Sequence, residues 1–388
     1  MFVNYVHSAE RDSPINLAVA RIVLGGWLIW KTIWYDWTPF VEAPFAGVAA
    51  PYYLWAVPGD PILLSILNWF LIVVLVAFII GYRIRLTAAL GALVTAYLGT
   101  VRFTLNSTGE TEALFIGSFF LLFFALYAET DELSFDEWRR VRSTATEDLR
   151  SKISRDAQAT YRAPALKWNL LMIAVIYFGS GFDKVFPGPT TAFATAENLS
   201  RIIVVRSYRY DQPFDLGLWM VDVPILIAVG AWGTLALELG FLLAVIAGVT
   251  VTPFILGFIG FTLANAVLLG IHFVDVYFIL ALFVAWDTIA ARVGHGRALE
   301  VQYDDQCAAC VRGLYFVQLI DLNETITVTP CANAAAGEQD PSIVVMTDGR
   351  TFEGYAGIRK LVAHFRLLVP FAWLMGLEPI KHTIRQDE

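Results

Sequence analysis

The sequence predicts an all-α polytopic membrane bundle of about eight spans, followed by a small α/β domain. Hydrophobic residues make up 57% of the 388 residues, and charged residues only 16%. Uncharged stretches recur over most of the chain with the length that a bilayer core requires, about 20 residues each. From about Leu299 the sequence instead has the patterning of a soluble protein. We therefore expect a membrane domain over residues 1–298 and a soluble domain over 299–388.

Apolar length, together with Gly, Pro and charged residues at the ends, indicates where each span begins and ends. The first residues, MFVNYVHSAERDSPIN, contain no apolar core, so no cleavable signal peptide is expected. The spans are expected at about 16–34, 62–82, 86–105, 113–127, 166–186, 223–248, 253–271 and 274–291.

Residues 131–165 interrupt the apolar pattern with a charged, helix-like segment that includes "FDEWRRVRSTATEDLR". A segment of mixed charge is typical of a solvated helical surface. We expect a helical hairpin that rests on the cytoplasmic face of the membrane.

Basic residues in short loops indicate the cytoplasmic side of a membrane protein. With eight spans they fall on one side: Arg83 and Arg85, the 131–165 hairpin, and Arg292 and Arg297. The C-terminal domain is then cytoplasmic. The acidic, lysine-poor composition suits a salt-loving or GC-rich prokaryote, and the expected location of the protein is the plasma (inner) membrane. The net charge is −8 and the sequence contains no basic patch, so no nucleic-acid partner is expected. The expected partner is the lipid bilayer.

The soluble tail begins with "LEVQYDDQCAACVRGLYFVQLI", a strand, a turn with C-x-x-C, and a helix. This arrangement predicts a thioredoxin-like α/β domain with Cys307 and Cys310 as a redox pair. The alternative is a pair of inert or metal-binding thiols. A zinc site needs four ligands, and there is no second cysteine pair or nearby histidine, so no metal is expected. Cys331 is interpreted as structural.

Ionisable residues inside spans cost a few kcal/mol each and usually face a cavity and a partner. The candidates are Lys31, Arg102, Asp183, Lys184, Glu238, His272 and Asp275.

Lys184 lies within about one turn of the end of its span, in "YFGSGFDKVF". One interpretation is a lysine that snorkels to the interface. The other is an amine that is partly desolvated, kept neutral and therefore able to act as a base. Gly179 and Gly181 favour the second interpretation, because small residues leave room for a ligand or a neighbouring helix.

Glu238 lies in the middle of its span, where a carboxylate must be protonated or paired with a cation. His272 and Asp275 are spaced i, i+3 and would share a face if helical. His272 is open to a structural or a functional interpretation. Lys31 is surrounded by aromatic residues, which favours an interfacial anchor.

Five motifs occur in the same order as in the HTTM membrane domain, which the vitamin K-dependent gamma-glutamyl carboxylases share with many prokaryotic proteins. They are "ARIVLGGWLIW", "LSFDEW", "YFGSGFDKVF", "LALELGFLL" and "LLGIHFVDVYFILALFVAW". The chain resembles this family over about residues 10–290. It departs from the animal enzymes in having no histidine at 106–113, where Glu110 and Glu112 are the nearest candidates, and no large lumenal domain.

This resemblance implies a membrane enzyme that uses a reduced naphthoquinone of the vitamin K or menaquinone type, with O2 and CO2. Lys184 matches the catalytic lysine, which deprotonates the quinol so that O2 adds and gives a strong oxygen base. That base removes a C–H proton, and the carbanion takes up CO2, with a peptide or protein as the implied substrate. Glu238 and His272 are expected to be catalytic as well. Tyr177, Asp183 and Asp275 are expected to contact the cofactor.

Residues 299–388 resemble the DCC family of thiol–disulfide oxidoreductase-like domains through "YDDQCAAC" and "FEGYAGI", with Asp305 where glycine is usual. The resemblance implies that Cys307 is the nucleophile, with its thiolate favoured by the helix N-terminus, and that Cys310 is the resolving thiol. A second hypothesis is therefore a membrane-tethered thiol–disulfide or quinone redox protein. A third is a membrane scaffold or transporter, for which the ionisable residues would be dispersed at the lipid edge.

Overall fold

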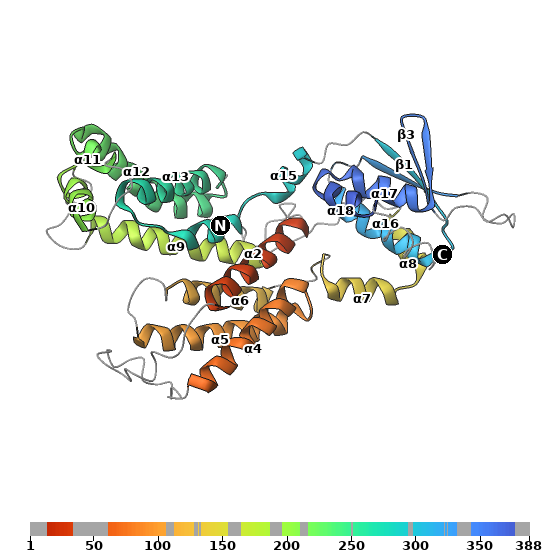
Figure 1. Ribbon diagram of the computed structural model, residues 1–388, viewed down its shortest axis with the longest axis horizontal. Coiled ribbons are helices and arrows are strands. Elements are labelled where there is room, and N and C mark those ends of the chain that lie inside the picture. Colours follow the sequence, from red (N-terminus) through yellow and green to blue (C-terminus); the bar gives the residue numbers. More distant parts are fainter. Residues whose placement is uncertain are drawn as a thin grey trace. The chain divides into compact units, whose positions relative to one another are not determined.

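The computed structural model of the chain is largely helical and has a four-stranded sheet in its C-terminal part (Figure 1). It divides into two compact units: residues 1–10, 19–129 and 162–284 form one, and residues 11–18, 130–161 and 285–388 form the other. The residues that the structure describes are 14–33, 61–105, 112–127, 131, 133–153, 164–186, 196–209, 216–249, 251–293, 298–321, 323, 325–331 and 343–376.

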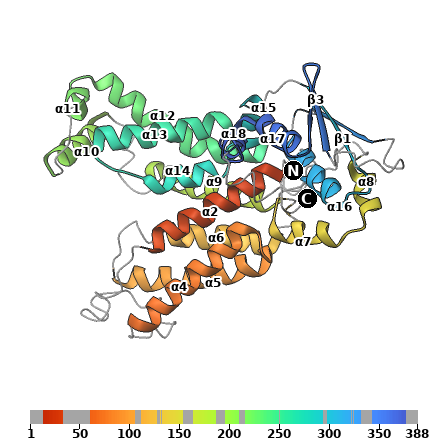
Figure 2. The same ribbon diagram turned by 45° about the vertical axis from the view of Figure 1, so that its right-hand side comes forward.

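The first unit is a bundle of apolar helices. Helix α5 packs against both α4 and α6, and α9 packs against α6 and α12. The two views agree in placing α4 and α5 side by side (Figure 1 and Figure 2). The helices are α2 (Pro14–Ile33), α4 (Pro61–Ile80), α5 (Ile84–Leu105), α6 (Glu112–Tyr127), α9 (Pro164–Val185), α10 (Ala196–Arg209), α11 (Leu216–Val221), α12 (Pro224–Ala247), α13 (Thr252–Leu269) and α14 (Val274–Ala281).

Among the described residues, six helices are long and apolar enough to cross a membrane, namely α2, α4, α5, α9, α12 and α13. Helix α6 is also apolar but has only 16 residues. Each of these seven lies within a few residues of a predicted span, because apolar length and helix-ending residues dominate the pattern. The chain is therefore a multi-pass membrane protein, while the total of eight spans stays a prediction.

Helix α4 shows why these helices suit a bilayer. One side is buried against the bundle through residues such as Leu71 and Phe78, each 0% exposed. The opposite side is equally apolar, with Trp69 and Val73 60% and 66% exposed. A helix that is apolar on all sides can face protein on one side and lipid on the other.

The predicted eighth span, 274–291, is not one helix. Helix α14 ends at Ala281, and a separate helix, α15 (Trp286–Val293), begins after a turn. The main-chain N–H of Asp287 donates to the side-chain oxygen of Asn16 at 3.0 Å, and the Asp287 carboxylate accepts from the N–H of Thr288 at 2.7 Å. These bonds satisfy donors that the first turn of a helix leaves unpaired, so a new helix begins there.

The second unit contains the sheet, whose strand order is β2-β1-β3-β4. Strand β1 pairs in parallel with β2 and antiparallel with β3, and β3 pairs antiparallel with β4. Helix α16 connects β1 to β2, and α17 follows β4. The elements are β1 (Leu299–Tyr303), α16 (Ala308–Ile320), β2 (Ile326–Pro330), β3 (Ile343–Thr347), β4 (Arg350–Glu353), α17 (Gly354–His364), η3 (Arg366–Leu368) and α18 (Val369–Leu374).

The charged segment after the fourth predicted span forms helices α7 (Phe135–Ser143) and α8 (Thr146–Ile153). Their apolar residues Val141 and Leu149 are each 1% exposed and belong to the same core as the sheet and α16. This hairpin therefore packs with residues 285–388 in one unit. The sequence predicts a solvated hairpin, but two apolar side chains in it find cover against the C-terminal domain, and their burial stabilises the contact.

Candidate functional site

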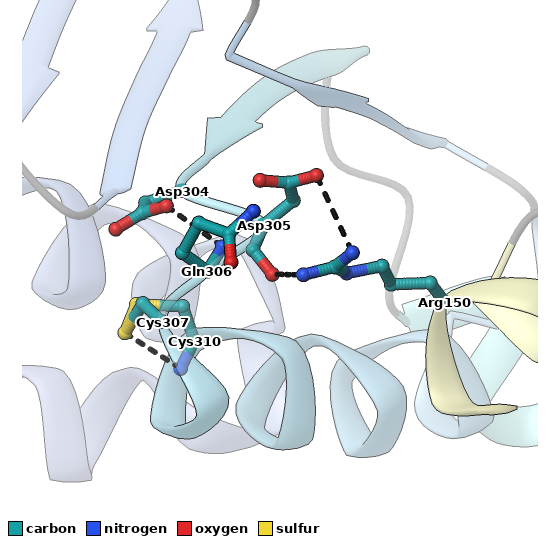
Figure 3. The surroundings of a disulfide bond; sticks show 6 residues. All are labelled: Arg150, Asp304, Asp305, Gln306, Cys307 and Cys310. Carbon is teal, nitrogen blue, oxygen red and sulfur yellow. Dashed lines mark hydrogen bonds and ion pairs between the residues drawn. A yellow bond between two sulfur atoms is a disulfide. The ribbon is translucent and has the colours of Figure 1, made fainter. Parts of the chain in front are cut away.

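A disulfide joins Cys307 and Cys310 at the start of α16 (Figure 3). Cys307 is the N-cap residue of α16, and its Sγ accepts from the N–H of Cys310 at 3.2 Å. Cys307 is partly exposed, whereas Cys310 is buried. A helix N-terminus favours negative charge, so this position stabilises a thiolate on the more accessible sulfur.

The loop between β1 and α16 holds the disulfide in place. Asp304 accepts from the N–H of Gln306 at 2.8 Å through its carboxylate, and from the N–H of Cys307 at 3.2 Å through its carbonyl. Such bonds are typical of turns that begin at an aspartate. These hydrogen bonds therefore hold Cys307 at the N-cap position of α16 in a defined conformation.

Arg150 reaches this loop from the hairpin helix α8. Its guanidinium donates to the main-chain carbonyl of Asp305, and Nη1 lies 3.6 Å from the Asp305 carboxylate (Figure 3). No sequence motif predicts this contact of Arg150. The signal for a contact of this hairpin was the set of apolar residues among its charged ones, such as Val141 and Leu149, which required a covering surface.

Cys331 lies outside the disulfide and is partly buried. Its main-chain N–H donates to the carbonyl of Tyr303 at 2.9 Å, just beyond the end of the β1–β2 pairing. Among the described residues, no group of three or more His, Cys, Asp or Glu side chains could hold a metal ion.

In the membrane unit, Lys184 and Glu238 form an ion pair. The Lys184 Nζ lies 2.5 Å from Oε1 and 2.6 Å from Oε2 of Glu238, and 2.9 Å from the Ser180 hydroxyl. The Glu238 side chain is 4% exposed and that of Lys184 is 23% exposed. The amine is therefore held by a carboxylate and a hydroxyl, and is not in the apolar surroundings that a lone neutral amine would need.

The pair forms because α9 and α12 approach closely at Gly181. A Cβ added to Gly181 would lie 2.9 Å from the Cβ of Glu238, closer than real Cβ atoms come to a neighbour. Only a glycine permits this approach, as at other close helix contacts in membranes. At Gly179, by contrast, an added Cβ would meet nothing within 4 Å. Of the two glycines in the motif, Gly181 is therefore the one that permits the close contact with the neighbouring helix α12.

Tyr177 lies on the same helix as Lys184, and its ring stacks on Phe258 of α13 with centroids 4.0 Å apart. The ring also meets Phe241 of α12 edge-on at 6.3 Å. Asp183, next to Lys184 in sequence, is exposed. Tyr177 thus has one ring face covered by protein, while Asp183 points away from the packed interior.

Asp275 belongs to a second ion pair. Its carboxylate lies 2.8 Å from Lys31 Nζ and accepts from the indole N–H of Trp27 at 2.8 Å. Lys31 is therefore part of a contact between α2 and α14, which the interpretation as an interfacial anchor did not foresee.

His272 and Asp275 do not share a helix face. Helix α13 ends at Leu269, because Gly270 adopts a left-handed conformation with φ of 63°. His272 is exposed and lies in the non-helical segment that precedes α14. Of the three expected catalytic residues, Lys184 and Glu238 are thus brought into contact. Glu110 and the side chain of Glu112 lie outside the described residues.

Comparison of the chain with protein-family models, with curated proteins and with solved structures finds no match in any of the three. The activity of the protein therefore has to be inferred from the chemistry of its two sites.

Proposed function

We propose that this protein is a membrane-tethered thiol–disulfide oxidoreductase that acts through Cys307 and Cys310. The observation that carries the proposal is the disulfide between these residues at the N-terminus of α16. The apolar helices of the first unit tether this redox domain to the bilayer.

We further propose that the C-terminal domain is thioredoxin-like. In support, β1, α16 and β2 form a strand–helix–strand unit with parallel strands, and the C-x-x-C stands at the strand-to-helix junction. Two antiparallel strands, β3 and β4, complete the sheet. The cysteine pair follows the end of β1, and Cys307 is its partly exposed member.

The proposed exchange proceeds in two steps. In the reduced protein the Cys307 thiolate attacks a substrate disulfide, forming a mixed disulfide and releasing one substrate thiolate. The Cys310 thiol then loses its proton to solvent and attacks the Cys307 sulfur. This second step releases the other substrate thiolate and forms the Cys307–Cys310 bond, so two electrons pass from protein to substrate. The reverse sequence oxidises a substrate dithiol.

The test uses the full-length protein in detergent or nanodiscs, first reduced with dithiothreitol and then freed of it, and a disulfide-linked peptide as substrate. We expect Cys307→Ser to abolish peptide reduction and Cys310→Ser to accumulate a mixed disulfide that mass spectrometry detects. Cys331→Ser is the matched control and should retain activity. Full activity in Cys307→Ser would exclude the proposal.

A second candidate function, quinol chemistry in the membrane unit, is supported by the Lys184–Glu238 contact. An amine and a buried carboxylate at hydrogen-bond distance can share and relay a proton. A reduced naphthoquinone with O2 would supply the strong base that the resemblance to the carboxylases implies. Lys184 would accept the quinol proton only if its own proton had passed to Glu238, so the two residues would act as a unit. Their contact also counts against a scaffold with dispersed ionisable groups.

This candidate is tested by supplying the purified protein with a reduced naphthoquinone and following epoxide formation under air. We expect epoxide from the wild type and none from Lys184→Ala or Glu238→Gln. The side chain of His272 is exposed, and the variant His272→Ala tests whether this residue takes part in the reaction. Adding CO2 and a glutamate peptide then tests carboxylation. Unchanged epoxide formation by Lys184→Ala would remove this lysine from the mechanism.

A further inference from the structure

We propose that Arg150 of the hairpin helix α8 is a positioning residue of the Cys307–Cys310 site and sets how readily the disulfide is reduced. The inference rests on the proposed thiol–disulfide exchange and adds to it a residue from a distant part of the sequence. If Arg150 has this role, the 131–153 hairpin contributes a residue to the redox site.

The first argument is the geometry of the contact. Arg150 binds Asp305 twice, through the main-chain carbonyl and through the carboxylate, with the latter 3.6 Å from Nη1. Asp305 stands two residues before Cys307, in the loop that ends at the helix cap (Figure 3). A guanidinium is planar, rigid and permanently charged. Its two contacts with Asp305 therefore restrain the position of the loop and compensate the negative charge of the Asp305 carboxylate.

The second argument is that α8 itself is held firmly in place. Leu149, adjacent to Arg150, is 1% exposed in the core shared with α16. On α7, Glu137 is 4% exposed, and its carboxylate accepts from Arg140 at 2.6 Å and from the Tyr315 hydroxyl of α16 at 3.2 Å. The hairpin is thus anchored by packing and by buried hydrogen bonds, so Arg150 meets the loop from a fixed support.

The third argument is electrostatic. The charged groups drawn around the disulfide are Arg150, Asp304 and Asp305 (Figure 3). Burial raises the pKa of Tyr303, at the end of β1, while Arg150 acts to lower that pKa and Asp305 to raise it. The charges of Arg150 and Asp305 therefore both act on a group at the strand-to-helix junction, and their effects on its pKa are opposite.

The consequence concerns the reduced state. A carboxylate two residues from Cys307 disfavours a thiolate there, and the Arg150 guanidinium compensates for it. Loss of the positive charge should destabilise the thiolate form of the reduced protein and so favour the disulfide. Loss of the Asp305 carboxylate should have the opposite effect, because Arg150 is then uncompensated.

The experiment measures the equilibrium between dithiol and disulfide in full-length protein carrying Cys331→Ala, using glutathione redox buffers and a maleimide gel shift. We expect Arg150→Met to lower the equilibrium constant for reduction about three- to tenfold, where tenfold corresponds to about 30 mV. We expect Asp305→Asn to raise it, and the double variant to return close to the parent. The rate of Cys307 alkylation against pH should shift upward in pH for Arg150→Met and downward for Asp305→Asn.

Leu361→Ala, at a residue of α17 that is 5% exposed in the same core, is the control for a purely structural effect, since it should lower the melting temperature without moving the equilibrium constant. If Arg150→Met folds poorly, Asp305→Asn still tests the charge effect. Equilibrium constants within twofold of the parent for both charge variants would overturn the proposal. This outcome is distinct from failure of the proposed function, in which the wild type would equilibrate with glutathione but would not reduce a disulfide-linked peptide.

Discussion

The Nζ atom of Lys184 lies 2.6 Å from Oε2 of Glu238, so two ionisable residues that are 54 positions apart in the sequence meet between α9 and α12. Each residue alone would be costly within an apolar helix, because an unpaired charge loses its hydration. Together they satisfy one another, with Ser180 as a further partner of the amine. The pair is thus a contact between two helices as well as a candidate site.

The first prediction is that either residue depends on the other for stability. Lys184→Met leaves a carboxylate that is 4% exposed without its cation, and we expect a loss of about 1–3 kcal/mol. Replacing both residues, as in Lys184→Met with Glu238→Met, should cost less than the sum of the single changes. Thermal unfolding of the four proteins in one detergent measures this coupling. Strict additivity would show that the pair contributes nothing.

The second prediction concerns the close approach of α9 and α12. Gly181→Ala places a Cβ 2.9 Å from the Cβ of Glu238 and 3.0 Å from Leu239, so the helices must move apart. We expect a loss of about 1–3 kcal/mol from overpacking, seen as a lower melting temperature. Gly179→Ala is the matched control, because its Cβ would meet nothing within 4 Å. Equal effects of the two substitutions would contradict this explanation.

The third prediction tests how the hairpin is attached. Tyr315→Phe removes the hydroxyl that donates to Glu137 at 3.2 Å. A buried carboxylate that loses one donor costs about 1–2 kcal/mol, although Arg140 still contacts it. We expect faster proteolytic cleavage within 131–161 in Tyr315→Phe. Tyr208→Phe, at a residue 84% exposed, serves as the control, and an unchanged cleavage rate in Tyr315→Phe would sink the prediction.

The fourth prediction is a pH dependence from His364 in α17. Burial lowers its pKa below the ordinary 6.5, while Asp321 opposes and Lys360 reinforces this shift. Below pH 6.5 the unfolded chain therefore binds more protons than the folded domain. The contribution of His364 to stability is complete above that pH and declines as the pH falls toward the lowered pKa.

We accordingly expect the melting temperature to fall between about pH 7 and about pH 5. The decline should be smaller in His364→Gln, in which no imidazole must be charged. The glutamine amide can still contact the Thr325 hydroxyl, which lies 2.9 Å from the imidazole. Identical pH profiles for the two proteins would refute the role of His364.

The class of the protein and the location of most of its elements could be predicted from the sequence. Apolar length alone predicts spans, because a bilayer-crossing helix must satisfy its backbone internally and cover it with apolar side chains. Glycine and proline mark several ends, as at Gly248 and Gly270, which are left-handed caps. The strand followed by C-x-x-C predicted a redox pair at the start of a helix, and in the structure Cys307 and Cys310 form a disulfide there. The thioredoxin-like fold and the count of eight spans stay predictions.

Which residues come into contact across the chain depends on how the helices and strands pack, and the sequence did not predict it. The ion pairs Lys184–Glu238, Lys31–Asp275 and Arg150–Asp305 each join residues that are far apart in the sequence. The tertiary structure also joined the charged hairpin to the C-terminal domain. Periodicity reports which side of one segment is apolar. It does not report which other segment covers that side, because the choice depends on the packing of several helices at once.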